Sequence, residues 1–254
     1  MTIKVDPEEN ETGALLDFVD LDGGRVLEIG SGDGRLTWRY AERAAQVTAV
    51  EPFAPAVMRA REHLPQELEG RVVLRQAAFA EFAAQAPRSA FDVTIFSWSL
   101  CCMERDGMVP ALEEVHRLLR PSGTLIDIHP VSGTAQVEVH CAGHVIFAEP
   151  ASASPDEGVL QADEALAHIV ARGLFVSERH REFDFRVYGS SGDELGDFLD
   201  EADAHSNQGC EEACDAFTSE LFARVDRIMA GKASAAEVAY HERVRIARLR
   251  PVIM

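Results

Sequence analysis

The chain has 254 residues, of which 46% are hydrophobic, and its formal net charge at pH 7 is −19. This length suits one large α/β core, and the composition supplies enough apolar side chains to fill it. The strong acidity argues against a nucleic-acid substrate, because binding to phosphate backbones relies on clustered lysine and arginine. The same acidity is compatible with a cationic small molecule.

The sequence also bears on the compartment. No apolar stretch approaches the roughly 20 residues that a bilayer-spanning helix needs. Residues 1–11 lack the basic and then apolar regions of a secretion signal. The cysteines form an odd set without framework spacing, namely Cys101, Cys102, Cys141, Cys210 and Cys214. We therefore expect a cytoplasmic protein without disulfides and without membrane association.

The first predicted element is a helix within residues 1–23. Asp6 is placed as its N-cap, Pro7 lies in the first turn, and Glu9 follows three residues after the cap. Residues 24–130 then alternate between apolar runs of strand length and segments of helical periodicity, which predicts a doubly wound, mostly parallel sheet of α/β class. We expect strands near 25–29, 47–51, 71–75, 91–96 and 124–129, and helices near 34–44, 54–63, 79–86 and 108–119.

Beyond Pro130 the pattern changes. Apolar alternation on both sides of Ala142 and Gly143 predicts a hairpin over 136–140 and 144–147. After a loop over 151–158, we expect a helix over 162–172, a strand over 174–188, helices over 193–203 and 211–230, and a strand over 240–250. Ser234 and Glu237 also form a helix-capping pattern, which competes with the last strand. We expect one domain over 1–254, with 131–160 and 189–236 as substrate-covering insertions.

The most informative motif follows the first strand of the sheet. Val26 to Thr37 reads VLEIGSGDGRLT, with glycines at 30, 32 and 34. Glycine tolerates positive φ and has no Cβ, so this turn can lie against a ligand. Its spacing is GxGxG, whereas the dinucleotide fingerprint is GxGxxG. The second strand ends in Glu51, about 20 residues after the first glycine, where a carboxylate can accept hydrogen bonds from ribose hydroxyls.

These residues resemble the first motif and the acidic second-strand end of the class I S-adenosylmethionine-dependent methyltransferases (methyltransferase type 11/25-like domain). Segments 91–100 and 117–123 resemble later landmarks of that family. The resemblance implies a Rossmann-like fold of seven strands, with the 174–188 and 240–250 segments as the final two, the hairpin as an insertion and extra C-terminal helices. It also implies S-adenosylmethionine as cofactor, bound by Glu28, Gly30, Ser31, Gly32, Gly34, Glu51, Pro52, Phe53, Ala78, Phe79, Ser97 and Trp98.

Within that set the resemblance implies different roles. Glu28 orients the loop, Glu51 binds the ribose and Phe53 flanks the adenine. The family often has an acidic residue where this chain has Ala78 and Phe79. Nearby Glu81 could replace that acid, and core positions for both Phe53 and Phe79 stay open.

His129 is the leading candidate for a general base, because it ends the fifth strand at the edge where ligands bind in such sheets. A structural strand-end histidine is the alternative. His140 and His144 are weaker candidates, and Cys101 and Cys102 are expected to be pocket walls. We expect no metal, since neither His140, Cys141 and His144 nor His205, Cys210 and Cys214 offers a four-ligand spacing.

The expected function is methyl transfer to an oxygen, nitrogen or other nucleophile of a small-molecule acceptor, mainly through proximity and orientation. Two alternatives stay open: a catalytically silent cofactor-binding module and, less favoured, an NAD-dependent oxidoreductase. The acceptor is not readable from the sequence. The C-terminal helical stripe could pack on its own sheet or on a second subunit, so a homodimer also stays open.

Overall fold

The computed structural model describes residues 3–151, 156–206, 219–230 and 236–253. It divides into two compact units, which are described separately. Unit 1 comprises residues 1–11, 130–156 and 183–244, and unit 2 comprises residues 12–129, 157–182 and 245–254.

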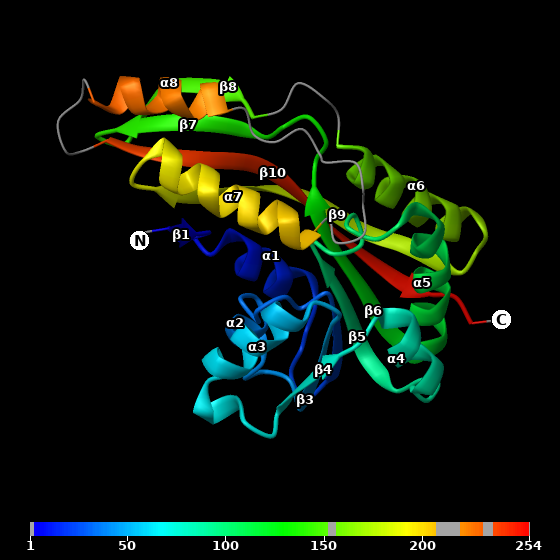
Figure 1. The fold of residues 1–254 in the computed structure, drawn as a ribbon. Helices are drawn as coiled ribbons and strands as arrows, with labels where there is room; N and C mark the ends of the chain where they lie inside the picture. Colours follow the sequence, from blue (N-terminus) through cyan, green and yellow to red (C-terminus); the bar gives the residue numbers. More distant parts are fainter. Residues whose placement is uncertain (1–2, 152–155, 207–218, 231–235, 254) are drawn as a thin grey trace. The chain divides into compact units, whose positions relative to one another are not determined.

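Unit 2 contains the alternating part of the chain (Figure 1). Its strand order is β9-β10-β6-β5-β2-β3-β4, and β2, β3, β4, β5 and β6 pair in parallel. The strands are β2 (Arg25–Ile29), β3 (Gln46–Glu51), β4 (Val72–Gln76), β5 (Phe91–Ser97), β6 (Leu119–Pro130), the start of β9 (Phe175–Gly189) and the end of β10 (Ala236–Pro251). This order and the alternation of strands with helices confirm the predicted doubly wound sheet.

Helices cover both faces of this sheet. Helices α4 (Phe79–Gln85), α5 (Arg105–Leu118) and α6 (Glu157–Ala171) share one apolar core with β2, β5 and β6. Helix α5 buries Met108, Leu112, Val115 and Leu118 at three- and four-residue intervals, as an amphipathic helix does against a sheet. Helices α2 (Thr37–Tyr40) and α3 (Ala54–His63) lie on the opposite face in Figure 1, and a short 3₁₀ turn covers Gln66–Leu68.

Unit 1 is built around a second group of strands. Its order is β1-β9-β10-β7-β8, with β1 (Lys4–Val5), β7 (Gln136–Cys141) and β8 (His144–Pro150). The predicted hairpin is confirmed, because β7 and β8 pair in antiparallel fashion around Ala142 and Gly143. Helices α7 (Gly192–Ser206) and α8 (Ser219–Ala230) pack against each other, and α8 contacts β7.

The helix predicted from Asp6 starts later than expected. Helix α1 spans Asn10–Phe18, and residues 6–9 form a turn in which Asp6 and Glu9 adopt positive φ. The Asp6 carboxylate still accepts the N–H groups of Asn10 and Glu11, at 3.1 and 2.9 Å. Asp6 therefore caps the helix from an extra turn upstream, which the linear capping pattern does not reveal.

Other boundaries also differ. The helix expected over 34–44 is the single turn α2, because residues 41–44 close into tighter turns with hydrogen bonds from Arg43 to Tyr40 and from Ala44 to Ala41. The last strand, β10, begins at Ala236, and Glu237 pairs with His140 of β7. The competing helix cap at Ser234 and Glu237 is therefore wrong for Glu237, and Ser234 lies outside the described residues. Residues 211–218 of the expected 211–230 helix also lie outside them.

Candidate cofactor site

The glycine loop (residues 30–36) connects β2 to α2 at the carboxyl edge of the sheet. Gly30 and Gly34 have φ values of +73° and +89°. A Cβ at Gly30 would overlap the Ser99 side chain, and one at Gly34 would overlap the Trp38 ring. Both positions therefore need glycine for backbone conformation and for space.

Glu51 ties this loop to the end of the neighbouring strand. Its Oε2 accepts the Gly32 N–H at 2.9 Å, and its Oε1 accepts the Phe53 N–H at 2.8 Å. The N–H groups of Gly30 and Ser31 donate to the carbonyl of Val50, at 2.8 and 3.2 Å. Since each carboxylate oxygen can accept more than one hydrogen bond, Glu51 can hold the loop and also accept a ribose hydroxyl.

Glu28 lies behind the loop and is almost completely buried. Its Oε2 accepts hydrogen bonds from Thr37 Oγ1 at 2.6 Å and from Tyr40 Oη at 2.8 Å. Burial and then the negative charge of Glu28 raise the pKa of Tyr40 well above its usual range. The phenol therefore keeps its proton and remains a donor to Glu28.

The remaining predicted residues fall into two groups. Pro52 and Phe53 follow Glu51, with Phe53 half-buried at the start of α3, and Ala78 is exposed at the start of α4. Phe79 is buried and meets the Phe96 ring edge-on, with 6.4 Å between ring centroids. Phe79 thus has the core position left open by the sequence.

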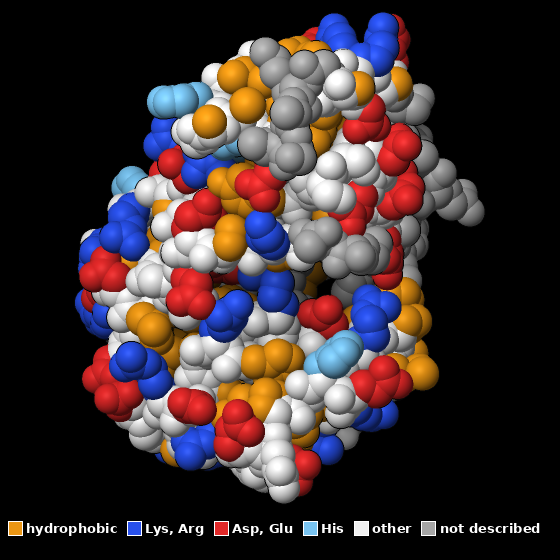
Figure 2. All heavy atoms as spheres, turned by 90° about the vertical axis from the view of Figure 1, so that its left-hand side faces the viewer, with side chains coloured by type: hydrophobic (Ala, Val, Ile, Leu, Met, Phe, Trp, Pro, Cys, Tyr) orange, Lys and Arg blue, Asp and Glu red, His pale blue; other side chains and the backbone are white. Residues whose placement is uncertain are grey.

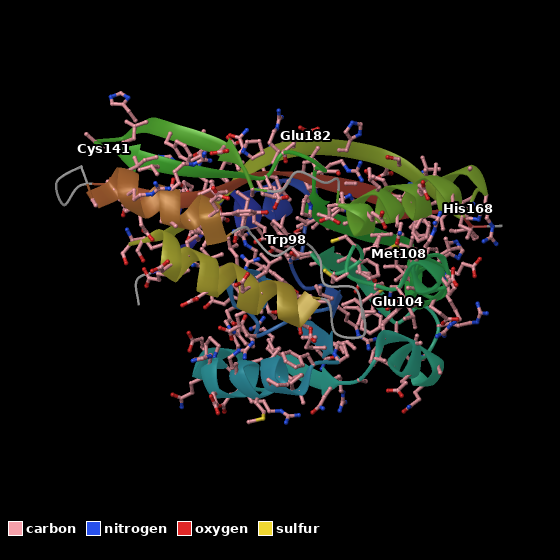
Figure 3. All side chains as sticks on the ribbon, turned by 45° about the horizontal axis from the view of Figure 1, so that its top comes forward. Trp98, Glu104, Met108, Cys141, His168 and Glu182 are labelled. Atoms are coloured by element: carbon pink, nitrogen blue, oxygen red, sulfur yellow. The ribbon has the colours of Figure 1, made fainter. Side chains whose placement is uncertain are left out.

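Ser97 and Trp98 form the exit of β5, one strand away from the loop. Trp98, labelled in Figure 3, has a φ of +56°, which is rare for a bulky residue. Its N–H donates to the carbonyl of Ile128 in β6, at 2.8 Å. Parallel pairing brings Ile29, Val50 and Phe96 to the same edge. The residues that follow these three in the chain therefore lie at the same edge, namely Gly30, Glu51 and Ser97.

The residues at this edge fit an adenosyl cofactor. Ser31 Oγ is buried within the loop and has no hydrogen-bond partner among the residues that the structure describes, whereas a buried hydroxyl normally has one. Ser31 is flanked by Gly30 and Gly32, which have no side chains, and the Glu51 carboxylate lies next to Gly32. The candidate ligand is one with hydroxyl and amino groups that can meet Ser31 and Glu51.

His129 lies at the end of β6 in a cluster of charged side chains (the His129 cluster: Asp127, His129, Asp163 and Arg245). Its Nδ1 lies 2.7 Å from Asp127 Oδ2, and its Nε2 lies 3.3 Å from Asp163 Oδ1 and 3.0 Å from Arg245 Nη2. Arg245 also pairs with Asp163. His129 and Asp127 are 1% and 0% exposed, and their close contact is misaligned for a hydrogen bond.

These neighbours change the acid–base behaviour of His129. Burial lowers its pKa, but the charge of Asp127 and the contacts with Asp127 and Asp163 outweigh burial and raise the pKa to about 9. The imidazole is then protonated at neutral pH and cannot accept a proton. This geometry favours the structural alternative over the general-base role expected for His129.

The other sequence candidates lie elsewhere. Cys102 is exposed and its thiol donates to the Trp98 carbonyl at 3.1 Å, whereas Cys101 packs against the core. His140 and His144 belong to unit 1, and His140 Nε2 lies 2.7 Å from Glu138 Oε2. Among the residues that the structure describes, no three His, Cys, Asp or Glu side chains are arranged to hold a metal ion. Cys210 and Cys214 lie outside that part of the chain.

Comparisons with known proteins bear on this edge of the sheet. The sequence profile of a family described as "Methyltransferase domain" matches residues 26–123. An uncharacterized methyltransferase of Geobacillus kaustophilus is 32% identical over 112 residues, which are 44% of this chain and 49% of that protein. A ubiquinone biosynthesis O-methyltransferase of Alkalilimnicola ehrlichii is 34% identical over 111 residues, covering 42% and 41% of the two chains.

The fold comparison agrees with the sequence comparison. The crystal structure of a putative methyltransferase from Bacillus halodurans matches 94% of this chain and 98% of its own, with a TM-score of 0.57 and 14% identity. The chain carries a domain of the class I S-adenosylmethionine-dependent methyltransferase family. S-adenosylmethionine is the cofactor of that family. The chain spans about half the length of the curated relatives it matches.

Several residues around this edge of the sheet are not indicated by the sequence patterns. Thr37 and Tyr40 lie at (i, i+3) spacing in the segment expected as helix, which could have flagged them as one face. Ser99, whose hydroxyl donates to the Ile29 carbonyl, follows a strand 70 residues away in the chain. Asp163 and Arg245 come from α6 and β10, and no local pattern connects them with His129.

Proposed function

We propose that this chain transfers a methyl group from S-adenosylmethionine to an oxygen, nitrogen or other nucleophile of a small-molecule acceptor. The observation that carries the proposal is the glycine loop, held at the carboxyl edge of the sheet by Glu51 within a methyltransferase domain. The name of the Alkalilimnicola ehrlichii relative describes an O-methyltransferase, which supports oxygen as one candidate nucleophile.

The mechanism assigns the protein mainly the task of orientation. When bound, S-adenosylmethionine supplies an electrophilic methyl group on a sulfonium with a good leaving group. Gly30 and Gly34 let the loop backbone turn tightly against Ser99 and Trp38, and Glu51, which holds Gly32, would accept a ribose hydroxyl. Holding two reactants in line can supply about 7–11 kcal/mol of the barrier. His129 takes no proton in this scheme, because its pKa is raised to about 9.

Calorimetry tests the cofactor half of the proposal. We expect S-adenosylmethionine and S-adenosylhomocysteine to bind and NAD to bind more weakly or not at all. Preferential NAD binding would overturn the proposal and support the oxidoreductase alternative. The transfer itself is tested by measuring S-adenosylhomocysteine formation with a panel of amines, phenols and carboxylates, where turnover of one class identifies the nucleophile.

A second candidate is a silent cofactor-binding module. Two observations favour it: an exposed Ala78 and a core Phe79 stand where the family often has an adenine-binding acid, and His129 is held as a cation. Tight binding of S-adenosylhomocysteine, together with no product from any member of the panel, would favour the module over the enzyme.

The surface charges bear on the class of acceptor. Figure 2 shows arginine and lysine side chains scattered among aspartate and glutamate on the face it presents, which supports a small acceptor over nucleic acid.

No helix in the described part of the chain is long and apolar enough to cross a membrane. We also propose that the protein is cytoplasmic, because its five cysteines have no disulfide-framework spacing. Light scattering in solution would test for a homodimer.

A further inference from the structure

We propose that Thr37 and Tyr40 are positioning residues for the cofactor, which act through Glu28 to fix the conformation of the glycine loop. The three side chains (the Glu28 cluster) join the residue two positions before the loop to the helix that follows it. Both hydroxyls donate to the same carboxylate oxygen, at 2.6 Å from Thr37 and 2.8 Å from Tyr40. The inference rests on the proposed function only in that the loop binds an adenosyl cofactor.

Helix α2 is a single turn that is attached to β2 at both ends. It has four residues, its preceding residue Leu36 makes no side-chain cap, and isolated helices of this length are unstable in water. Thr37 and Tyr40 are its first and last residues, and both are 0% exposed. Their hydrogen bonds to Glu28, itself 2% exposed, therefore attach both ends of the turn to β2.

Trp38 connects α2 to the glycine loop. Trp38 lies between the two anchoring residues, and its ring packs against Gly34 so closely that a Cβ there would overlap it. The Trp38 N–H also donates to the Gly34 carbonyl, at 3.0 Å. A turn released from Glu28 would move Trp38, and Gly34 would lose the surface that holds it.

The two hydrogen bonds to Glu28 bear on the affinity of the loop for the cofactor. Hydrogen bonds to a buried carboxylate contribute more than those between neutral groups, and removing one donor leaves the acceptor underused. In the free protein, a loop whose ends are less firmly held samples more conformations. Cofactor binding must then order the loop, and this ordering lowers the affinity. Loss of either hydroxyl should therefore weaken cofactor binding without removing any residue of the loop itself.

The test compares S-adenosylhomocysteine affinity by calorimetry in matched variants. Thr37→Val removes the hydroxyl at nearly constant volume, Thr37→Ser retains it, and Tyr40→Phe removes the phenol oxygen. Thr94→Val is the control, because Thr94 is another fully buried threonine of unit 2, and its hydroxyl has no hydrogen-bond partner in the described part of the chain. We expect about a tenfold loss of affinity for Thr37→Val and Tyr40→Phe, and less than about a twofold change for Thr37→Ser and Thr94→Val.

A second measurement needs no ligand. Amide hydrogen exchange of residues 30–36 in the free protein should accelerate in Thr37→Val and Tyr40→Phe and stay unchanged in Thr94→Val. Wild-type affinity and exchange in both Thr37→Val and Tyr40→Phe would overturn the inference, as would equal losses in Thr37→Ser and Thr37→Val. If Thr37→Val does not fold, Tyr40→Phe and Thr37→Ser decide. Failure of the wild type to bind S-adenosylhomocysteine contradicts the proposed function instead, and hydrogen exchange still tests the role of the Glu28 cluster.

Discussion

The glycine loop and the His129 cluster lie at the same edge of unit 2, yet they are held in different ways. The loop is fixed by backbone N–H groups that donate to Glu51 and Val50, both within about 20 residues of it in the chain. The His129 cluster is fixed by charged side chains from β6, α6 and β10. The first arrangement depends on conformation and space, and the second depends on charge, so different substitutions should damage them.

The largest expected effect is on the loop. Gly30→Ala should lower S-adenosylhomocysteine affinity at least about 100-fold, because it combines strain at positive φ with overlap on Ser99. Gly173→Ala is the matched control, since Gly173 has the same φ of +73° and a Cβ added there would have nothing within 4 Å. Equal affinities of the two variants in calorimetry would show that space at Gly30 does not matter.

Next in size is the effect of removing a charge from the cluster. Asp127→Asn should lower the free energy of unfolding by about 3 kcal/mol, because it leaves the buried His129 cation without its nearest partner. Urea unfolding measures the loss, with Asp163→Asn as a milder comparison because the Asp163 side chain is 40% exposed. An unchanged midpoint in Asp127→Asn would mean that His129 is neutral in the folded protein.

The pH dependence of stability separates the two regions further. The folded pKa of His129, about 9, lies above its unfolded value of about 6.5. Its contribution to stability is therefore fully present below pH 6.5 and is lost as the pH rises through about 9. Between these limits we expect wild type to lose up to about 3 kcal/mol relative to His129→Gln, measured by urea unfolding at several pH values. Parallel pH profiles of the two proteins would contradict a raised pKa.

The smallest effect is expected at Glu51. Glu51→Gln keeps one carbonyl acceptor but replaces the other oxygen with an amide donor, so one of the two N–H groups, of Gly32 or of Phe53, loses its acceptor. We expect about a tenfold loss of S-adenosylhomocysteine affinity in calorimetry. Glu62→Gln, on an exposed position of α3, should bind as wild type does. A larger effect than in Gly30→Ala would reverse the order of importance within the loop.

The sequence predicts one of these regions far better than the other. The strands 25–29 and 46–51 and the loop between them follow from short-range patterns, because glycine spacing and a strand-end acid are local signals. The His129 cluster depends on contacts over more than 100 residues, as between His129 and Arg245, and no periodicity encodes such a contact. For this reason position alone predicts a base at His129, whereas the surrounding side chains raise the pKa of this residue.

Helix boundaries show the same limit on a smaller scale. Residues 34–44 are expected as one helix, but Arg43 and Ala44 donate to carbonyls only three residues earlier, so tighter turns follow the regular helix Thr37–Tyr40. Phe79 shows the same limit for a side chain, because only its packing against Phe96, which lies on another element, distinguishes a core residue from a ligand contact.

The two hydrogen bonds of Glu51 have a consequence for the length of its side chain. One carboxylate spans the gap between Gly32, on the first connection, and Phe53, on the second. An aspartate at this position would be one methylene shorter, which withdraws the carboxylate toward its own strand by roughly 1.5 Å. An aspartate could still accept the Phe53 N–H two residues on, but the loop at Gly32 would have to move toward β3 to keep its hydrogen bond, so the present spacing of the two connections matches the length of a glutamate.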